Sequence, residues 1–207
     1  MIFDGSGTII PRVCTLALFL CGASVNCMGV FVETMKIVLH ICCGVCAAGV
    51  VERLTSEGHQ VLGLFYNPNI HPLEEYQRRL EAAREVARRL DFPLEIGPYT
   101  TEEWFQETTS LEKEPEGGKR CEVCFRLRLK KAYLHMENQG GDAFTTTLTV
   151  SPHKSARVVN RIGREIGGES FLERDFKKQD GFKRAIELAK KWSLYRQNYC
   201  GCVYSIR

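Results

Sequence analysis

Residues 36–46, KIVLHICCGVC, decide the fold of this chain. The first six form a continuous apolar run, which is typical of a strand buried on both faces of a sheet. The segment CCGVCAAGVVERLTSEGH (42–59) follows at once, and its small first residues and Gly58 near its end predict a helix. The three cysteines of this stretch therefore fall at a strand-to-helix turn.

The same alternation of strand and helix continues to the end of the chain. We expect further strands at 60–67, 93–99, 142–150 and 169–176, and helices at 42–59, 73–90, 101–109, 121–139, 151–168 (with Pro152 in its first turn) and 181–194. Strands that alternate with helices of this length predict a doubly wound, mostly parallel sheet flanked by helices in a single domain.

Functional groups of such a sheet collect beyond the carboxyl ends of its strands, where strand order reverses. Cys42, Cys43 and Cys46 occupy that edge. No SGGxDS-type phosphate loop and no GxGxxG follows the first strand, which disfavours nucleotide-dependent thiolation.

The first 34 residues differ in composition from the rest of the chain, because they contain almost no charged residues. Arg12 alone is too small a basic region for a signal peptide, and the apolar run is too short to cross a bilayer, so we expect no membrane partner. We interpret 1–34 as a non-native or unstructured extension created by a start codon placed too early, with Met35 as the true first residue. The catalytic domain is then 35–207, and its formal charge is +4 instead of +3, which suits an acidic partner.

Seven of the ten cysteines fall into three tight groups separated by long, ordinary globular sequence, while Cys14, Cys21 and Cys27 lie in the extension. Secreted disulfide scaffolds instead distribute half-cystines through short, loop-rich chains. The grouping favours metal binding or thiol catalysis in a reducing compartment, so we expect a cytoplasmic protein.

Each cysteine group has more than one interpretation. The turn at Cys42, Cys43 and Cys46 leads into a helix N-terminus, which lowers a thiol pKa, although any one of these side chains could instead be a small buried residue. The pair Cys121 and Cys124 could be half of a zinc site, part of an iron-sulfur site or a thioredoxin-like pair. Together with the first group it could complete a shell of four thiolates.

The pair Cys200 and Cys202 is separated by one residue, so a disulfide between them closes a very small ring. Such a ring departs from relaxed geometry and is easily reduced, which favours a reversible dithiol. The alternative is that both are further metal ligands.

Other candidates are less specific. The cationic residues after the CxxC pair could face phosphate or simply be solvated, and no spacing singles out a catalytic acid. The cations are Arg126, Arg128, Lys130 and Lys131, and the acid candidates are His40, His71, His153 and Asp175.

Five motifs in order resemble the epoxyqueuosine reductase family of the QueH type over residues 35–205. They are LHICCGVC (39–46), FYNPNIHPLEEYQRR (65–79), EPEGGKRCEVCFRLRL (114–129), FTTTLTVSPHK (144–154) and YRQNYCGCVYS (195–205). The extension is the departure from the family pattern.

The resemblance implies a HUP-like fold and the last step of queuosine biosynthesis, the reduction of epoxyqueuosine to queuosine at the wobble position of tRNA. It implies a [4Fe-4S] cluster on Cys42, Cys43, Cys121 and Cys124, and a redox-active disulfide between the last two cysteines, Cys200 and Cys202. It also allows an additional iron, with Cys46 as a metal ligand. The implied partners are the anticodon loop of tRNA and an unidentified electron donor.

Aromatic residues near the motifs could stack an unpaired base or belong to the core. They are Phe65, Tyr66, Tyr195 and Tyr199. Two other classes of protein compete with the reductase: a zinc-stabilised RNA-binding module without catalysis, which leaves Cys46 and the CxC pair without a role, and a plain thiol-disulfide oxidoreductase, which would tolerate loss of metal.

Overall fold

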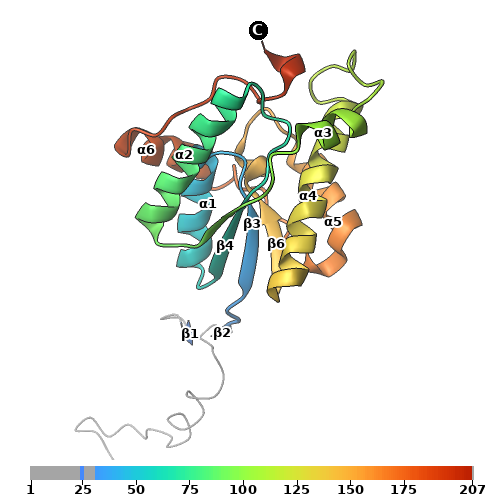
Figure 1. The fold of residues 1–207 in the computed structure, drawn as a ribbon. Coiled ribbons are helices and arrows are strands. Elements are labelled where there is room, and N and C mark those ends of the chain that lie inside the picture. Colours follow the sequence, from blue (N-terminus) through green and yellow to red (C-terminus); the bar gives the residue numbers. More distant parts are fainter. Residues whose placement is uncertain (1–23, 26–30, 207) are drawn as a thin grey trace, which may run out of the picture. The chain divides into compact units, whose positions relative to one another are not determined.

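The computed structural model describes residues 24–25 and 31–206, in two units, Met1–Thr34 and Met35–Arg207. In the first unit the short strands β1 (Ser24–Val25) and β2 (Phe31–Val32) pair antiparallel. The other residues of the predicted extension up to 30, including its three cysteines, lie outside the described residues. The second unit is an α/β domain (Figure 1). None of the described helices is long and apolar enough to cross a membrane.

A four-stranded parallel sheet forms the centre of this domain. Its spatial order is β5-β4-β3-β6, with β3 (Lys36–His40), β4 (Gln60–Phe65), β5 (Leu94–Ile96) and β6 (Ala143–Thr146). Strand β3 places Lys36 opposite Gln60 of β4 and Ile37 opposite Ala143 of β6. The side chains of its apolar run, from Ile37 to Leu39, are fully buried, as the sequence predicts.

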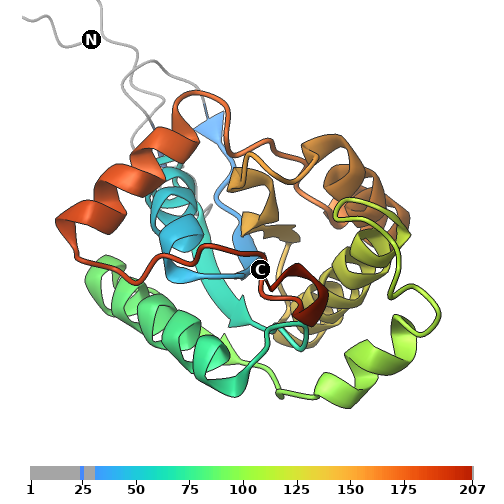
Figure 2. The same cartoon turned by 90° about the horizontal axis from the view of Figure 1, so that it is seen from above.

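Helices cover both faces of the sheet, as Figures 1 and 2 show. On one side α1 packs against α2 and α6, and on the other α4 packs against α5, β3 and β6. The helices are α1 (Gly44–Ser56), α2 (Leu73–Leu90), α3 (Thr101–Glu107), α4 (Lys119–Gln139), α5 (Ala156–Gly167) and α6 (Gly181–Lys191). The predicted doubly wound α/β fold is confirmed.

Three element predictions near the end of β6 are wrong in extent. The strand ends at Thr146, because its side-chain oxygen accepts a hydrogen bond from the Leu148 amide (3.1 Å) and starts a 3-10 helix, Thr147–Val150. The next helix begins at Ala156, where the Ser155 side chain caps it, so Pro152 lies outside its first turn. At 169–176 a single bridge, Phe144 with Phe171, replaces the predicted strand.

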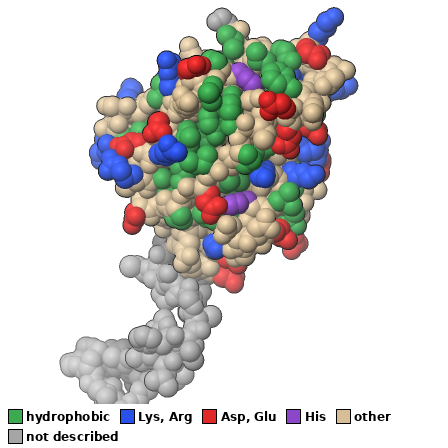
Figure 3. All heavy atoms as spheres, in the orientation of Figure 1, with side chains coloured by type: hydrophobic (Ala, Val, Ile, Leu, Met, Phe, Trp, Pro, Cys, Tyr) green, Lys and Arg blue, Asp and Glu red, His purple; other side chains and the backbone are tan. Residues whose placement is uncertain are grey.

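The outer face of α2 is charged, as its predicted amphipathic pattern requires. Arg84 pairs with Glu81 (2.5 Å), and Arg88 and Arg89 both pair with Glu85. Figure 3 shows hydrophobic groups gathered down the middle of this view of the molecule, with charged groups on either side. Exposed pairs one turn apart contribute little to stability, so burial of the opposite face is what holds the helix in place.

Candidate metal and thiol site

Strand order reverses between β3 and β6, because the chain runs from β3 through β4 to β5 and then places β6 on the other side of β3. Cys42 follows β3 and Thr147 follows β6, so both lie at the switch point. The Thr147 hydroxyl accepts a hydrogen bond from the Cys42 amide (3.0 Å) and donates one to the Cys42 sulfur (3.3 Å). The position where ligands bind in such folds is therefore occupied by a thiol.

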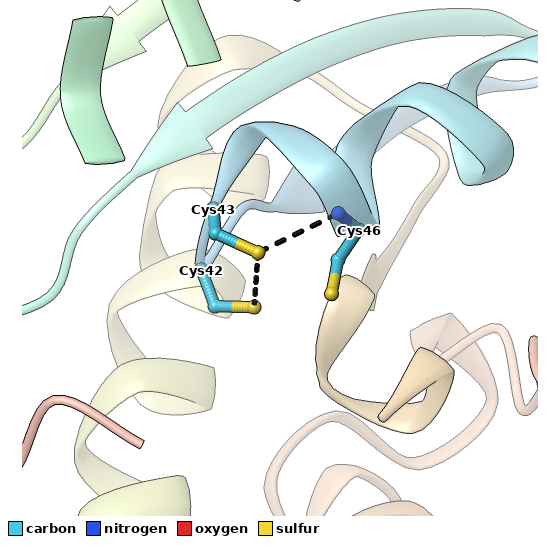
Figure 4. A group of neighbouring side chains, drawn as sticks. All are labelled: Cys42, Cys43 and Cys46. Carbon is cyan, nitrogen blue, oxygen red and sulfur yellow. Dashed lines mark hydrogen bonds between the residues drawn. The ribbon is translucent and has the colours of Figure 1, made fainter. Parts of the chain in front are cut away.

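Cys42, Cys43 and Cys46 form a buried group that we call the thiol trio (Figure 4). Their sulfurs all lie within 4.8 Å of one another, and among the described residues they are the one set of three or more His, Cys, Asp or Glu side chains this close. Cys43 is the N-cap of α1, and its sulfur accepts a hydrogen bond from the Cys46 amide (3.5 Å). The predicted strand-to-helix turn thus holds the trio together.

Gly44 explains how the start of α1 fits at this edge. A Cβ atom at Gly44 would lie 2.4 Å from the carbonyl oxygen of Ala82 in α2, a distance that real Cβ atoms do not tolerate. Glycine therefore permits α1 and α2 to approach each other at the trio.

The three thiols share their protons unequally. Hydrogen bonds from Cys43 and then Cys46 lower the pKa of Cys42 well below its usual value. Donating to Cys42 raises the pKa of Cys43 to about 12 and raises that of Cys46 too. The trio thus releases one proton readily and resists losing the next, so a bound cation is what would allow further ionisation. Soft thiolate donors of this kind suit iron-sulfur groups and zinc.

The other four described cysteines form a second group, the thiol quartet of Cys121, Cys124, Cys200 and Cys202. All four line a cavity of about 60 Å³. Cys124 and Cys202 are buried against Trp104, and the Gly117 amide donates to the Cys121 sulfur (3.2 Å). The fold therefore brings the CxxC pair of α4 next to the CxC pair near the end of the chain.

Within the quartet, Cys200 is the sulfur that ionises. The pKa of Cys200 is lowered to about 5, first by a hydrogen bond from Cys202 and then by Ser205, whose hydroxyl lies 3.0 Å away. The pKa of Cys202 is raised, first because it donates that bond. Both are free thiols in this structure. One thiolate beside one thiol is the state from which a dithiol reacts.

A larger cavity of about 770 Å³ lies beside the two thiol groups. Cys42 and Cys46 line it from the trio and Cys200 lines it from the quartet. Arg128 and Lys154 line this cavity and the small one as well, so the same cations face both groups. A volume of this size is typical of small-molecule sites and suits a nucleoside.

Residues 195–206, which we call the C-terminal tail, contribute contacts that the sequence does not predict. The Gln197 side-chain amide donates to the Cys43 sulfur (3.0 Å) across 154 positions of sequence. Ser205 contacts Cys200, and Arg79 of α2 donates to the carbonyl oxygens of Tyr199 and Cys200. Because the contacts of Gln197 and Arg79 join distant segments, no local spacing could have indicated them.

The structure separates the acid candidates. His40 is fully buried with Nδ1 against the Thr146 hydroxyl (2.8 Å) and Nε2 against the Tyr66 carbonyl (3.1 Å), and burial lowers its pKa to about 4. Burial also lowers the pKa of His71. His153 lines both thiol cavities, whereas Asp175 lines a separate groove beside α5.

The predicted stacking residues divide in the same way. Phe65 and Tyr66 are completely buried core residues, while Tyr199 lines the large cavity and Tyr195 is partly buried. The predicted cationic stripe is not one surface. Arg126 is exposed and pairs with Glu165, and Lys130 is exposed. Arg128 is buried, and the ammonium group of Lys131 lies over the ring of Tyr66.

A parallel α/β sheet with two thiol groups around a nucleoside-sized cavity at its switch point defines a metal-thiolate or thiol redox enzyme. Comparison with known proteins identifies which one. A sequence model of the family described as "Epoxyqueuosine reductase QueH" matches residues 37–207. The chain belongs to this family, whose members are named as reductases.

Two curated relatives carry the same name. The epoxyqueuosine reductase QueH of Streptococcus pyogenes serotype M1 is 36% identical over 183 residues, covering 83% of this chain and 71% of the relative. That of Haemophilus influenzae is 36% identical over 176 residues, covering 83% and 72%. These relatives do not favour the zinc-stabilised RNA-binding module.

A solved structure supports the fold. The U34-tRNA thiolase NcsA from Methanococcus maripaludis, solved with its [4Fe-4S] cluster, superposes with a TM-score of 0.51. The match is 12% identical and covers 84% of this chain and 62% of the thiolase. Identity this low is evidence for a shared α/β fold alone.

Proposed function

We propose that this protein reduces epoxyqueuosine to queuosine at the wobble position of tRNA, the last step of queuosine biosynthesis. One observation carries the proposal: in a chain of the QueH family, six of the seven described cysteines line two cavities that share Cys200, and the seventh, Cys43, lies with Cys42 and Cys46. A closed structural zinc site has four protein ligands and no open position. The large cavity beside the thiols therefore favours an enzyme over the RNA-binding module.

The reaction balances with a dithiol as the reductant. Two C–O bonds of the epoxide break, one C=C bond forms, and the oxygen leaves as water after taking up two protons and two electrons. Closure of Cys200 and Cys202 to a disulfide supplies those electrons, because two S–H groups become one S–S bond. The depressed pKa of Cys200 and the raised pKa of Cys202 suit these two roles.

We assign Cys42, Cys43, Cys121 and Cys124 as ligands of a [4Fe-4S] cluster, as the family resemblance implies. The chemistry of the donor set fits this group, since all four ligands are thiols, Cys42 and Cys43 from the trio and Cys121 and Cys124 from the quartet. In the trio, a bound cation is what would allow more than one thiol to ionise. When bound, the cluster supplies one-electron transfers from an external donor. Cys46, whose sulfur lies with those of Cys42 and Cys43, is the ligand we assign to an additional iron.

The tRNA substrate agrees with the charge of the site. Arg128, Lys154 and Arg196 line the large cavity, and a formal net charge of +3 suits a partner bound through a few phosphates. We place the reaction in the cytoplasm, because the proposed substrate is tRNA and the cysteines occur in tight groups rather than in the distribution of a secreted disulfide scaffold. The external electron donor is a separate protein or small reductant.

The test uses the full chain purified without oxygen. It should be brown, contain iron and sulfide, and convert epoxyqueuosine in tRNA to queuosine when a low-potential reductant is supplied, as measured by mass spectrometry of the digested nucleosides. A colourless protein that contains zinc and binds tRNA without converting it would establish the RNA-binding module instead. Conversion by metal-free protein would establish the plain thiol-disulfide oxidoreductase.

A further inference from the structure

A buried ion pair lies beneath the CxC turn. Arg79 and Glu75, one turn apart on α2, are only 3% and 5% exposed, and Nε of Arg79 lies 2.6 Å from Oε1 of Glu75. A buried charge pair is costly to desolvate unless its remaining hydrogen-bonding groups are also used. The partners of those groups therefore indicate what the pair is for.

Both remaining nitrogens of Arg79 donate to the backbone of the tail. Nη1 donates to the carbonyl oxygen of Cys200 and Nη2 to that of Tyr199, each at 3.0 Å. The next carbonyl oxygen, that of Gly201, accepts from the His71 amide (2.8 Å). Three consecutive carbonyl groups of the redox turn are thus held by α2 and the loop before it.

The turn fits closely around the guanidinium group. Gly201 has φ +103°, and a Cβ atom there would lie 2.9 Å from Nη1 of Arg79. The guanidinium also lies over the ring of Tyr199, 5.2 Å from its centroid. On the other side, Oε2 of Glu75 accepts from the Tyr195 hydroxyl (2.5 Å). A lysine keeps the charge of Arg79 but cannot reproduce this planar fork.

We propose that Arg79 and Glu75 are positioning residues for the dithiol: they hold the backbone of the CxC turn in the conformation in which the Cys200 and Cys202 sulfurs can join. This inference rests on the proposed dithiol role of that pair. Glu75 neutralises the charge of Arg79, so the pair acts by geometry and leaves the ionisation of Cys200 to Cys202, Ser205 and Lys154.

The experiment compares Arg79→Lys with Ser205→Ala in the anaerobic holoprotein. For each, the fraction of closed Cys200–Cys202 ring is measured by thiol labelling and mass spectrometry in buffers of graded thiol-disulfide ratio. The pKa of Cys200 is measured from the pH dependence of its alkylation. Iron content and kcat and KM for tRNA are measured on the same samples.

The two variants should shift the reduction potential of the Cys200–Cys202 pair in opposite directions. Arg79→Lys should weaken ring closure about tenfold, which shifts the reduction potential by about 30 mV towards positive values. The pKa of Cys200 and the iron content should not change. The variant should lower kcat by a larger factor than it raises KM. Ser205→Ala should raise the pKa of Cys200, which destabilises the reduced thiolate and moves the potential the other way. Tyr195→Phe removes one hydrogen bond to Glu75 and should weaken ring closure by a smaller factor than Arg79→Lys. It replaces Arg79→Lys in the test if that variant does not fold.

Wild-type ring closure and kcat in both Arg79→Lys and Tyr195→Phe would overturn the positioning role. Loss of iron together with ring closure would overturn it too, because the pair would then be a general structural support. If the wild-type thiol count does not change between oxidised and reduced samples, the dithiol role itself fails, and that result is recognisable without any variant.

Discussion

At the scale of single residues, the ionisation of each thiol is set by its neighbours. Cys43 illustrates this, since it caps α1, lies 3.8 Å from the Cys42 sulfur through its own sulfur and accepts from the Gln197 amide. The sequence predicts the strand-to-helix turn at this position and the helix that follows. It does not predict the contact with Gln197, which depends on how the tail crosses the carboxyl edge of the sheet.

We predict that Cys43→Ser and Cys121→Ser each lose most of the bound iron, because a serine hydroxyl is a far poorer ligand for iron than a thiolate. Serine remains a good N-cap, so Cys43→Ser should leave α1 intact. Iron and sulfide per chain are the measurement, with circular dichroism as the control for folding. Wild-type iron in either variant would remove that residue from the ligand set.

Cys200→Ser and Cys202→Ser should behave in the opposite way, because we place this pair outside the cluster. Each variant should keep the colour and iron of the wild type and lose turnover of epoxyqueuosine in tRNA by at least about 100-fold, since the dithiol can no longer close. The number of free thiols in the wild type should change by two on oxidation. Iron loss in either variant would show that the pair is a ligand set.

His40 should make stability depend on pH. Burial lowers its pKa from 6.5 to about 4, so the unfolded chain binds one more proton than the folded chain between these values. The associated stability, about 3 kcal/mol, is complete above pH 6.5 and is lost as the pH falls towards 4. Urea unfolding at pH 7 and pH 5 should show a loss of about 2 kcal/mol of it, and His40→Gln should remove this part of the pH dependence. An unchanged pH dependence in the variant would contradict the assignment.

At the scale of elements, the strand and helix around the first cysteines are the part of the fold that the sequence predicts best. The buried run of β3 and the small residues of α1 are local patterns, and their predicted positions are confirmed. The end of β6 is predicted poorly, since threonines suit both a strand and a capped turn, and the Thr146 side chain favours the 3-10 helix. That same turn places Thr147 against Cys42.

Two glycines of α1 provide a matched test of how this element positions the thiol trio. Gly44→Ala introduces a Cβ atom against the Ala82 carbonyl at 2.4 Å, so the helix start must move, at a cost of about 1–3 kcal/mol. Gly49→Ala meets nothing closer than 3.4 Å and should stabilise the helix by about 0.5–1 kcal/mol. The free energy of unfolding, measured in urea, and the iron content should therefore both fall in Gly44→Ala. Neither should fall in Gly49→Ala.

At the scale of the whole molecule, the site depends on contacts between segments that are far apart in the chain. The seven grouped cysteines and the parallel sheet can be predicted from sequence, because both are local patterns. Their division into a trio and a quartet cannot, since it follows from the order of strands and from the path of the C-terminal tail. The anchoring of that tail by Arg79 is likewise a contact across 121 positions.

The last prediction concerns the unit that carries all of these contacts. The described core runs from Ile37 to Cys202, and β3 begins at Lys36, whose amide donates to Asp142 (2.7 Å). A chain that starts at Met35 keeps that strand whole, so it should retain the unfolding free energy, iron content and activity of the full chain. A chain that starts at Val38 loses the first two pairs of β3 with β4 and should be clearly less stable. Urea unfolding and iron analysis of the three chains decide the matter, and a loss of stability or iron already at Met35 would show that residues 1–34 belong to the functional protein.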